Sequence, residues 1–345
     1  MTPDQSMAEL SDHLFTVAVA LYSLAVVAFC AQLAFGRRPA LVGAGAPVLD
    51  HAADPDVESE RGRRWGLAAM ALTVLGAVAH AGVLVTRGRR WGVVAMALTI
   101  LGALTQAGVL VFRGLATDRL PWGNMYEFAT ATVLVAVVAY VVLALRSPGL
   151  RHIGVFVLAP VVLALVLIGL FLYAEAGPLV AALRSYWLAI HVTTAILGFG
   201  IFFVSGIASV LYLVRVRSDA REQEARAAGE PVADGIVSRL PAAASLDRVA
   251  HRTAVFGFPV WTFAVIAGAI WAESAWGRFW GWDPKETWAF IAWVVYAGYL
   301  HARTTAGWRG QPAAWVNVVG LVVMVFNLLF VNIVSTGLHS YAGVG

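Results

Sequence analysis

The stretch IGVFVLAPVVLALVLIGLFLY at residues 153–173 decides the fold class of this chain. It contains no charged side chain. A bilayer's hydrocarbon core is about 30 Å thick, and an α-helix needs roughly 20 apolar residues to cross it. Backbone N–H and C=O groups find no water inside a bilayer, so a spanning segment must satisfy them internally, as a helix does. The stretch therefore predicts a membrane-spanning helix.

Apolar runs of this kind fill most of the chain. Nine candidates are found, at residues 14–36, 66–86, 92–112, 126–145, 153–173, 187–214, 254–272, 288–302 and 314–334. Of the 345 residues, 60% are hydrophobic and only 13% are charged, which excludes an ordinary soluble globular protein. The first run is not a cleavable signal peptide, because residues 1–13 carry no Arg or Lys and the run is too long. We predict an all-α polytopic membrane protein.

Two of the runs belong to a tandem repeat that makes the number of spans ambiguous. Residues 61–86 and 87–112 are identical at 19 of 26 positions. If both copies span, the protein has nine helices and a cytoplasmic N-terminus. If one copy spans, it has about eight helices and its acidic N-terminus lies outside. Basic residues favour the cytoplasmic side, and this bias prefers eight spans, with the second copy as the true span and the first as an accessory.

The same bias predicts which loops lie outside. Arg-containing segments at 146–152, 215–252 and 301–309 are expected in the cytoplasm. Successive loops alternate between the two sides of the membrane. This alternation predicts that the segments 113–125, 174–186 and 271–287 lie outside, together with the C-terminus at 335–345. The net charge is +4, but the basic residues sit in clusters between spans and form no single face for a nucleic acid.

The only cysteine, Cys30, lies within an apolar run. An intrachain disulfide and a CxxC site are therefore impossible. Any thiol chemistry must use the cysteines of another protein.

The most informative stretch is WGRFWGWDPKETW at residues 276–288, in a predicted outer loop. One interpretation is an aromatic belt at the membrane interface, but a belt needs Trp scattered over both interfaces. A dense group of flat rings separated by glycine suits a large planar apolar ligand. Asp283, Pro284 and Glu286 also fit a capping box that starts the next helix, which is compatible with a ligand role.

Two cations accompany this stretch. Lys285 is the only lysine of the chain, and Arg278 lies seven residues before it. They either anchor the loop at the membrane interface or pair with carboxylates of a ligand.

Three of the eight histidines are candidate ligands. His191 lies about two helical turns from the predicted outer end, below Arg184, and His339 follows the last span. Two outer histidines flanking a Trp-rich loop can supply two axial imidazoles to a haem, whereas the surroundings lack the cysteines and close acidic spacing of a zinc site. His301 lies 18 residues after Asp283. That is about 27 Å along a helix, so it cannot share their metal.

The stretch WGRFWGWDPKETWAFIAW at 276–293 resembles the tryptophan-rich WWD domain of haem-handling proteins. Its surroundings are similar to the CcsA/ResC family (CcsB in actinobacteria) of the system II cytochrome c synthase. The matching pieces are PWGNMYEF at 121–128, HVTTAILGFG at 191–200, LHAR at 300–303 and LHSY at 338–341. The resemblance covers about residues 91–345. It implies a haem-handling membrane domain there, with the WWD loop at 271–288, preceded over residues 1–90 by a span, a cytoplasmic loop and the first repeat copy.

The resemblance also implies roles for particular residues. His191 and His339 would be axial ligands of an outer haem, and His301 would belong to a second, inner haem position. The candidate haem platform comprises Trp276, Trp280, Trp282, Asp283 and Trp288. Candidate contacts to the haem propionates or to the haem chamber are Arg278, Lys285, Arg184, Asn124 and Glu127. Asn124 and Glu127 either line the chamber or only cap their helix.

The implied activity is haem transport and covalent ligation in cytochrome c biogenesis. Haem b would be the transported substrate, and the CxxCH of an apocytochrome c would supply both thiols. The implied partners are a ResB-type subunit and a thiol-reducing protein, in the plasma (inner) membrane with the WWD loop and C-terminus external. The chain would be a subunit of a holocytochrome c synthase (haem lyase), and the sequence leaves open whether it alone is an enzyme.

Two alternatives remain. A system I haem-handling subunit also carries a WWD loop between two histidines, but it has six spans, and the length, His301 and the 121–128 segment argue against it. The other alternative is a haem-binding transporter or redox membrane protein without synthase activity. A redox carrier would pair its histidines inside the bilayer, whereas His191 and His339 flank an outer loop.

Overall fold

The computed structural model describes residues 4–35, 60–178, 183–231, 237–305, 307–334 and 337–339, without the side chains of 35, 60–87, 148, 152, 239 and 332–334. This part of the chain is helical and contains no strand. Its α-helices are α1 (Gln5–Phe35), α2 (Glu60–Thr117), α3 (Met125–Arg146), α4 (Gly154–Phe171), α5 (Tyr186–Ala227), α6 (Ala243–Trp276), α7 (Pro284–Thr304) and α8 (Gln311–Val334). Short 3-10 helices occupy Pro148–Ile153 and Val237–Arg239.

The helices are those of a membrane protein. Among the described residues, seven helices are long and apolar enough to cross a bilayer. The eighth, α7, has 21 residues but carries charged side chains at both ends, which lower its mean hydropathy. Large apolar side chains face outward, including Leu104 at 65%, Leu170 at 71% and Phe256 at 66% exposure. Such a surface suits lipid and would aggregate in water. The prediction of an all-α polytopic membrane protein is confirmed.

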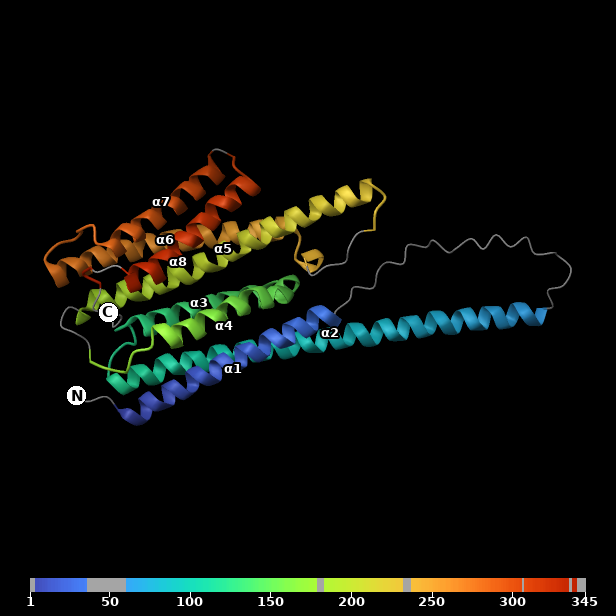
Figure 1. The fold of residues 1–345 in the computed structure, drawn as a ribbon, viewed down its shortest axis with the longest axis horizontal. Helices are drawn as coiled ribbons and strands as arrows, with labels where there is room; N and C mark the ends of the chain where they lie inside the picture. Colours follow the sequence, from blue (N-terminus) through green and yellow to red (C-terminus); the bar gives the residue numbers. More distant parts are fainter. Residues whose placement is uncertain are drawn as a thin grey trace.

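The tandem repeat lies within one continuous helix. α2 has 58 residues. Its length is therefore about 87 Å, far more than a bilayer core needs. The two copies do not form an antiparallel pair of spans, and the candidate span is Gly88–Thr117. Figure 1 shows α2 extending well beyond the helix bundle. This arrangement matches the alternative in which one copy spans.

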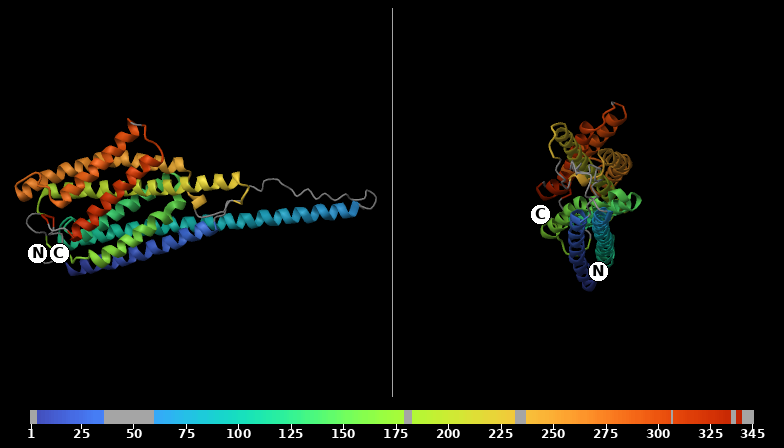
Figure 2. Two further views of the ribbon diagram at one scale, coloured as in Figure 1. Left: turned by 45° about the horizontal axis from the view of Figure 1, so that its top comes forward. Right: turned by 90° about the vertical axis from the view of Figure 1, so that its right-hand side faces the viewer.

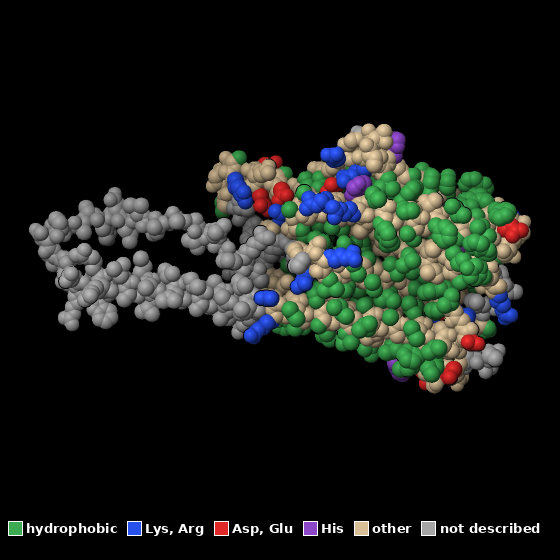
Figure 3. Space-filling view, turned by 180° about the vertical axis from the view of Figure 1, so that it is seen from behind, with side chains coloured by type: hydrophobic (Ala, Val, Ile, Leu, Met, Phe, Trp, Pro, Cys, Tyr) green, Lys and Arg blue, Asp and Glu red, His purple; other side chains and the backbone are tan. Residues whose placement is uncertain are grey.

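The bundle consists of two groups of helices that meet where α3 packs against α5. α1 and α2 pack together with α3 and α4 beside them, and α5 packs against α6 and α8 with α7 beside α8. Figures 1 and 2 show these groups side by side, with the helices running up and down in turn. One side of the bundle therefore contains the C-terminal ends of α2, α4, α6 and α8 and the N-terminal ends of α3, α5 and α7. Figure 3 shows basic side chains concentrated toward the opposite end of an apolar surface.

Buried polar side chains join the helices within each group. Gln106 of α2 accepts from the Tyr22 hydroxyl at 2.8 Å and donates to the carbonyl of Thr130 at 2.8 Å. Asn317 of α8 donates to the Ser205 hydroxyl of α5 at 2.9 Å. Because lipid gives helices little hydrophobic reason to associate, such bonds and close packing fix their arrangement.

Candidate functional site

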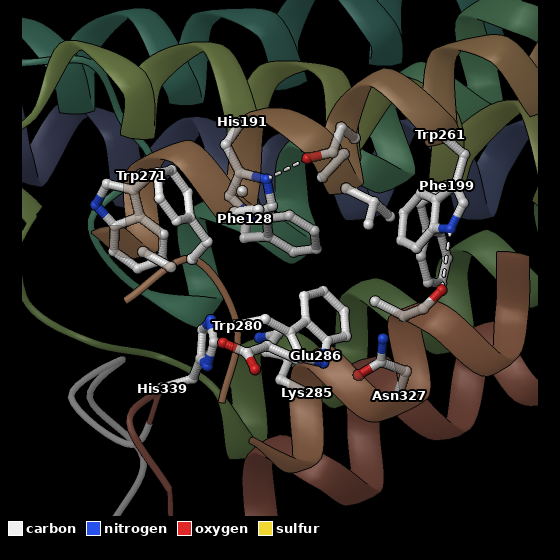
Figure 4. A pocket seen from close by; sticks show the side chains of 18 of the residues that line it. Phe128, His191, Phe199, Trp261, Trp271, Trp280, Lys285, Glu286, Asn327 and His339 are labelled. Atoms are coloured by element: carbon white, nitrogen blue, oxygen red, sulfur yellow. Dashed lines mark hydrogen bonds between the residues drawn. The ribbon is translucent and has the colours of Figure 1, made fainter. Parts of the chain in front are cut away.

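A cavity of about 770 Å³ lies near the end of the bundle where the predicted outer segments gather. Its walls come from α3, α5, α6, α7, α8 and the Trp-rich loop. Its lining includes Phe128, His191, Phe199, Trp261, Trp271, Trp276, Phe279, Trp280, Lys285, Glu286, Asn327 and His339. Figure 4 shows most of these side chains converging on one space. The mostly apolar and aromatic lining with a few polar groups is typical of a site for a small organic ligand.

His191 enters this cavity from α5 in a fixed orientation. Its Nδ1 lies 2.8 Å from the carbonyl oxygen of Ala264. A carbonyl only accepts, so Nδ1 carries a proton, and in the neutral imidazole Nε2 is then the nitrogen that keeps a lone pair. The imidazole stacks on Trp271 at 5.9 Å and 9°. A Cβ on Gly268 would lie 2.7 Å from the ring, so only glycine there leaves room for the imidazole.

His339 enters from the segment after α8 and is held by Asp283. Its Nδ1 lies 2.8 Å from Oδ2 of Asp283, whose Oδ1 accepts from the backbone N–H of Leu338 at 2.7 Å. Asp283 is only 7% exposed. It also starts α7 through the predicted capping box, in which Glu286 accepts from the backbone N–H of Asp283 at 3.1 Å. One carboxylate thus starts a helix and positions an imidazole 56 residues away.

The protonation of this pair favours a ligand role. Burial lowers the pKa of His339, although the hydrogen bond to Asp283 opposes that effect. Burial alone would raise the pKa of Asp283, but hydrogen bonds from His339 and from backbone N–H groups lower it. The pair is therefore a neutral imidazole donating to a carboxylate, which is how metal-binding histidines are usually oriented.

The two imidazoles face the same space from different walls. Trp271 contacts both rings, with its centroid 5.9 Å from that of His191 and 5.8 Å from that of His339, so the two imidazole centroids are at most about 12 Å apart. Figure 4 shows them on opposite sides of the cavity. Two neutral imidazoles across an aromatic space fit the axial ligand set of a haem.

The four predicted platform tryptophans separate into two pairs. Trp276 and Trp280 line the cavity, and Trp276 contacts the His339 ring at 5.0 Å. Trp282 is 66% exposed with φ of 56°, and it does not line this cavity. Trp288 packs instead against Phe326 of α8, with ring centroids 4.3 Å apart. Two of the four platform tryptophans therefore face the cavity and two do not.

The prediction missed four aromatic residues in the cavity wall, Trp261, Trp271, Phe128 and Phe199. Trp271 is 2% exposed and contacts both histidines. It lies five residues before the quoted stretch, on the last turns of α6. A sequence signal for it existed, because it continues the tryptophan cluster toward the N-terminus. Phe128 and Phe199 lie within the quoted segments 121–128 and 191–200, but their side chains are those of ordinary apolar residues of a span, so neither was given a role.

The candidate cations differ in position. Lys285 lines the cavity, with Nζ 3.5 Å from Sδ of Met125 and 5.8 Å from the Phe128 ring centroid. The Arg278 guanidinium lies against Gly281, where a Cβ would collide with it, and Arg278 does not line the cavity. Arg184 is exposed near the start of α5 and does not line it either.

Asn124 and Glu127 act differently from each other. Asn124 caps α3 by accepting from the backbone N–H of Glu127 at 2.9 Å, and it lines a second, smaller cavity. Glu127 is fully buried and lines neither cavity. It pairs with Arg113 at 3.2 Å and Arg119 at 2.8 Å, and it accepts from the backbone N–H of Gly123 at 2.7 Å. Glu127 therefore fixes the 119–124 segment from behind.

His301 lies apart from this site, as its spacing predicted. It is exposed near the end of α7, with Nδ1 3.4 Å from the Thr305 hydroxyl. It lines neither of the two cavities near Trp271.

Several known proteins with similar sequences are named cytochrome c biogenesis protein CcsA. The protein from Parasynechococcus marenigrum is 41% identical over 179 residues, which are 48% of this chain and 59% of the relative. That from Guillardia theta is 39% identical over 176 residues, 48% of this chain and 58% of the relative. The chain thus spans somewhat more than half the length of these two relatives.

A longer alignment joins the chain to the protein from Synechococcus elongatus. It is 36% identical over 259 residues, covering 64% of this chain and 78% of the relative. Residues 122–339 match the family of cytochrome C assembly proteins. These residues include the 121–128 motif almost entirely, both cavity histidines and the Trp-rich loop. The chain belongs to the cytochrome C assembly protein family.

Proposed function

We propose that this protein serves cytochrome c biogenesis by holding a haem between His191 and His339 and presenting it for covalent attachment to an apocytochrome c. The observation that carries the proposal is the pair of imidazoles across one aromatic cavity, each held in place by an acceptor at Nδ1. The names of its relatives support the same process.

Each imidazole has a partner that sets its tautomer. The Ala264 carbonyl accepts from His191, and the Asp283 carboxylate accepts from His339. A carboxylate behind an imidazole raises its basicity and orients it toward a metal. The haem iron would therefore bind Nε2 of both residues. Trp271, Trp276 and Trp280 would hold the porphyrin and exclude water from it.

The covalent step belongs to the substrate's thiols. Each S–H of the CxxCH adds across one haem vinyl group, forming one C–S and one C–H bond with no leaving group and no net redox change. The only cysteine of this chain, Cys30, lies on α1. The role of the protein is to hold the haem and bring thiols and vinyls together, which raises their effective concentration. The histidine of the CxxCH would replace one axial ligand on release.

Orientation and partners complete the proposal. The arginine-rich end of the bundle would face the cytoplasm of a plasma (inner) membrane, and the site would face outward. A ResB-type subunit would supply further parts, and a thiol-reducing protein would keep the CxxCH reduced. His301 would serve a second haem position on the inner side, which rests on the sequence resemblance alone.

Expression with its ResB-type partner and a CxxCH substrate, in a host lacking its own cytochrome c maturation, tests this function. Covalent haem on the substrate is expected, and it should require both His191 and His339. Haem bound to this protein without any covalent product would favour the second candidate, a haem transporter without synthase activity. Absence of bound haem in the purified complex would refute both.

A further inference from the structure

A second cavity of about 510 Å³ lies beside the first. Both cavities are lined by Phe128, His191, Trp271, Lys285 and His339. The two spaces therefore adjoin around the axis that joins the two histidines. A flat ligand held between those imidazoles would extend one edge into each cavity.

The two cavities differ in the chemistry of their walls. The deep wall of the larger cavity carries Phe199, Trp261 and Val265. The smaller cavity instead carries Trp122 and Asn124, from the segment before α3. Nε1 of Trp122 is buried and has no hydrogen-bond partner among the described residues. A buried N–H without an acceptor costs free energy, so its presence in a cavity wall indicates a ligand that accepts there.

Three more features favour an anionic acceptor. Asn124 caps α3 through its side-chain oxygen. The NH₂ group of the same amide takes no part in the cap and is a hydrogen-bond donor. The start of α3 adds the partial positive charge of a helix N-terminus. Lys285 lines the same cavity and supplies a full positive charge. The nearby carboxylate of Glu127 is neutralised by Arg113 and Arg119.

We propose that the smaller cavity is a carboxylate pocket that receives the propionate edge of the haem. Trp122 and Lys285 donate to the carboxylates, and Asn124 completes the wall. The vinyl edge then lies in the larger cavity beneath the Trp-rich loop. Phe279, 59% exposed, marks the rim through which the substrate's cysteines reach it. This orientation rests on the proposed function, because it assumes haem between His191 and His339.

Titration of the purified full-length protein with its partner, using haem and haem dimethyl ester, tests the pocket. The ester keeps the ring, iron and vinyls but lacks carboxylates. Trp122→Phe keeps the indole's bulk approximately and removes its N–H. A hydrogen bond to a charged group contributes to the binding free energy, so haem should bind roughly tenfold more weakly to Trp122→Phe, which lacks that bond. Ester binding should change less than about twofold on the same reasoning. Lys285→Met should show the same selectivity, and Trp308→Phe, which changes an exposed tryptophan, should leave both ligands unaffected.

The outcomes separate the two proposals. If Trp122→Phe binds haem as the wild type does, or loses haem and ester equally, the carboxylate pocket is wrong while the haem site stands. If the wild type binds neither porphyrin, the proposed function fails and the pocket with it.

Discussion

Replacing Gly268 by alanine tests whether His191 must keep its present position. The new Cβ would lie 2.7 Å from Cε1 and Nδ1 of the imidazole. Ordinary carbon contacts are about 3.5 to 4.0 Å, so the ring must move by roughly 1 Å. A shift of that size strains the 2.8 Å hydrogen bond from Nδ1 to the Ala264 carbonyl and redirects Nε2. Loss of such an orienting contact typically lowers metal-ligand affinity by about 10- to 100-fold.

The assay is an optical titration of purified Gly268→Ala with haem, following the low-spin spectrum of an iron with two imidazole ligands. Gly298→Ala is the matched control, because a Cβ at Gly298 meets no atom within 4 Å. Both changes favour the helix by up to about 1 kcal/mol, so lost haem affinity cannot be assigned to lost helix stability. If Gly268→Ala binds haem with wild-type affinity and spectrum, the assignment of His191 is refuted.

Three further predictions concern neighbouring residues. Asp283→Asn keeps a good helix cap but removes the charge behind the axial imidazole, so haem affinity should fall about 10-fold or more in the same titration; unchanged affinity would contradict the role of the carboxylate. Glu127→Gln leaves Arg113 with only the longer 3.4 Å ion pair to Asp12, so it should destabilise the fold and lower the thermal unfolding temperature in detergent; an unchanged temperature would show that the pair is not stabilising. Trp280→Ala should weaken haem binding and Trp282→Ala should not, because only Trp280 lines the cavity, and equal effects would argue against this geometry.

The spans were predictable because lipid imposes a simple rule on length and composition. Residues 153–173 contain all of α4, and the capping box at Asp283 marks the start of α7 as the structure has it. The repeat was harder, since each copy alone is long and apolar enough to span. Whether both copies form separate spans is decided by the structure, in which the two copies continue as one helix, α2, that packs against α1.

The site was predictable by residue type more than by geometry. Histidine and clustered tryptophan are chemically conspicuous, so they pointed to His191, His339 and Trp280, which line one cavity in the structure. The contact between Asp283 and His339 joins positions 56 residues apart, and no local pattern indicates it. Gly268 matters only because a neighbouring helix brings an imidazole against it, which is a property of tertiary packing.

The most direct test of the haem site is the optical spectrum of reduced haem in the protein purified with its partner, compared with His191→Gly and His339→Gly. The wild type should show low-spin haem with two imidazole ligands. Each variant should lose that spectrum and recover it when free imidazole is added, because imidazole can fill the space left by the side chain. If either variant keeps the wild-type spectrum without added imidazole, that histidine is not an axial ligand and the central claim is contradicted.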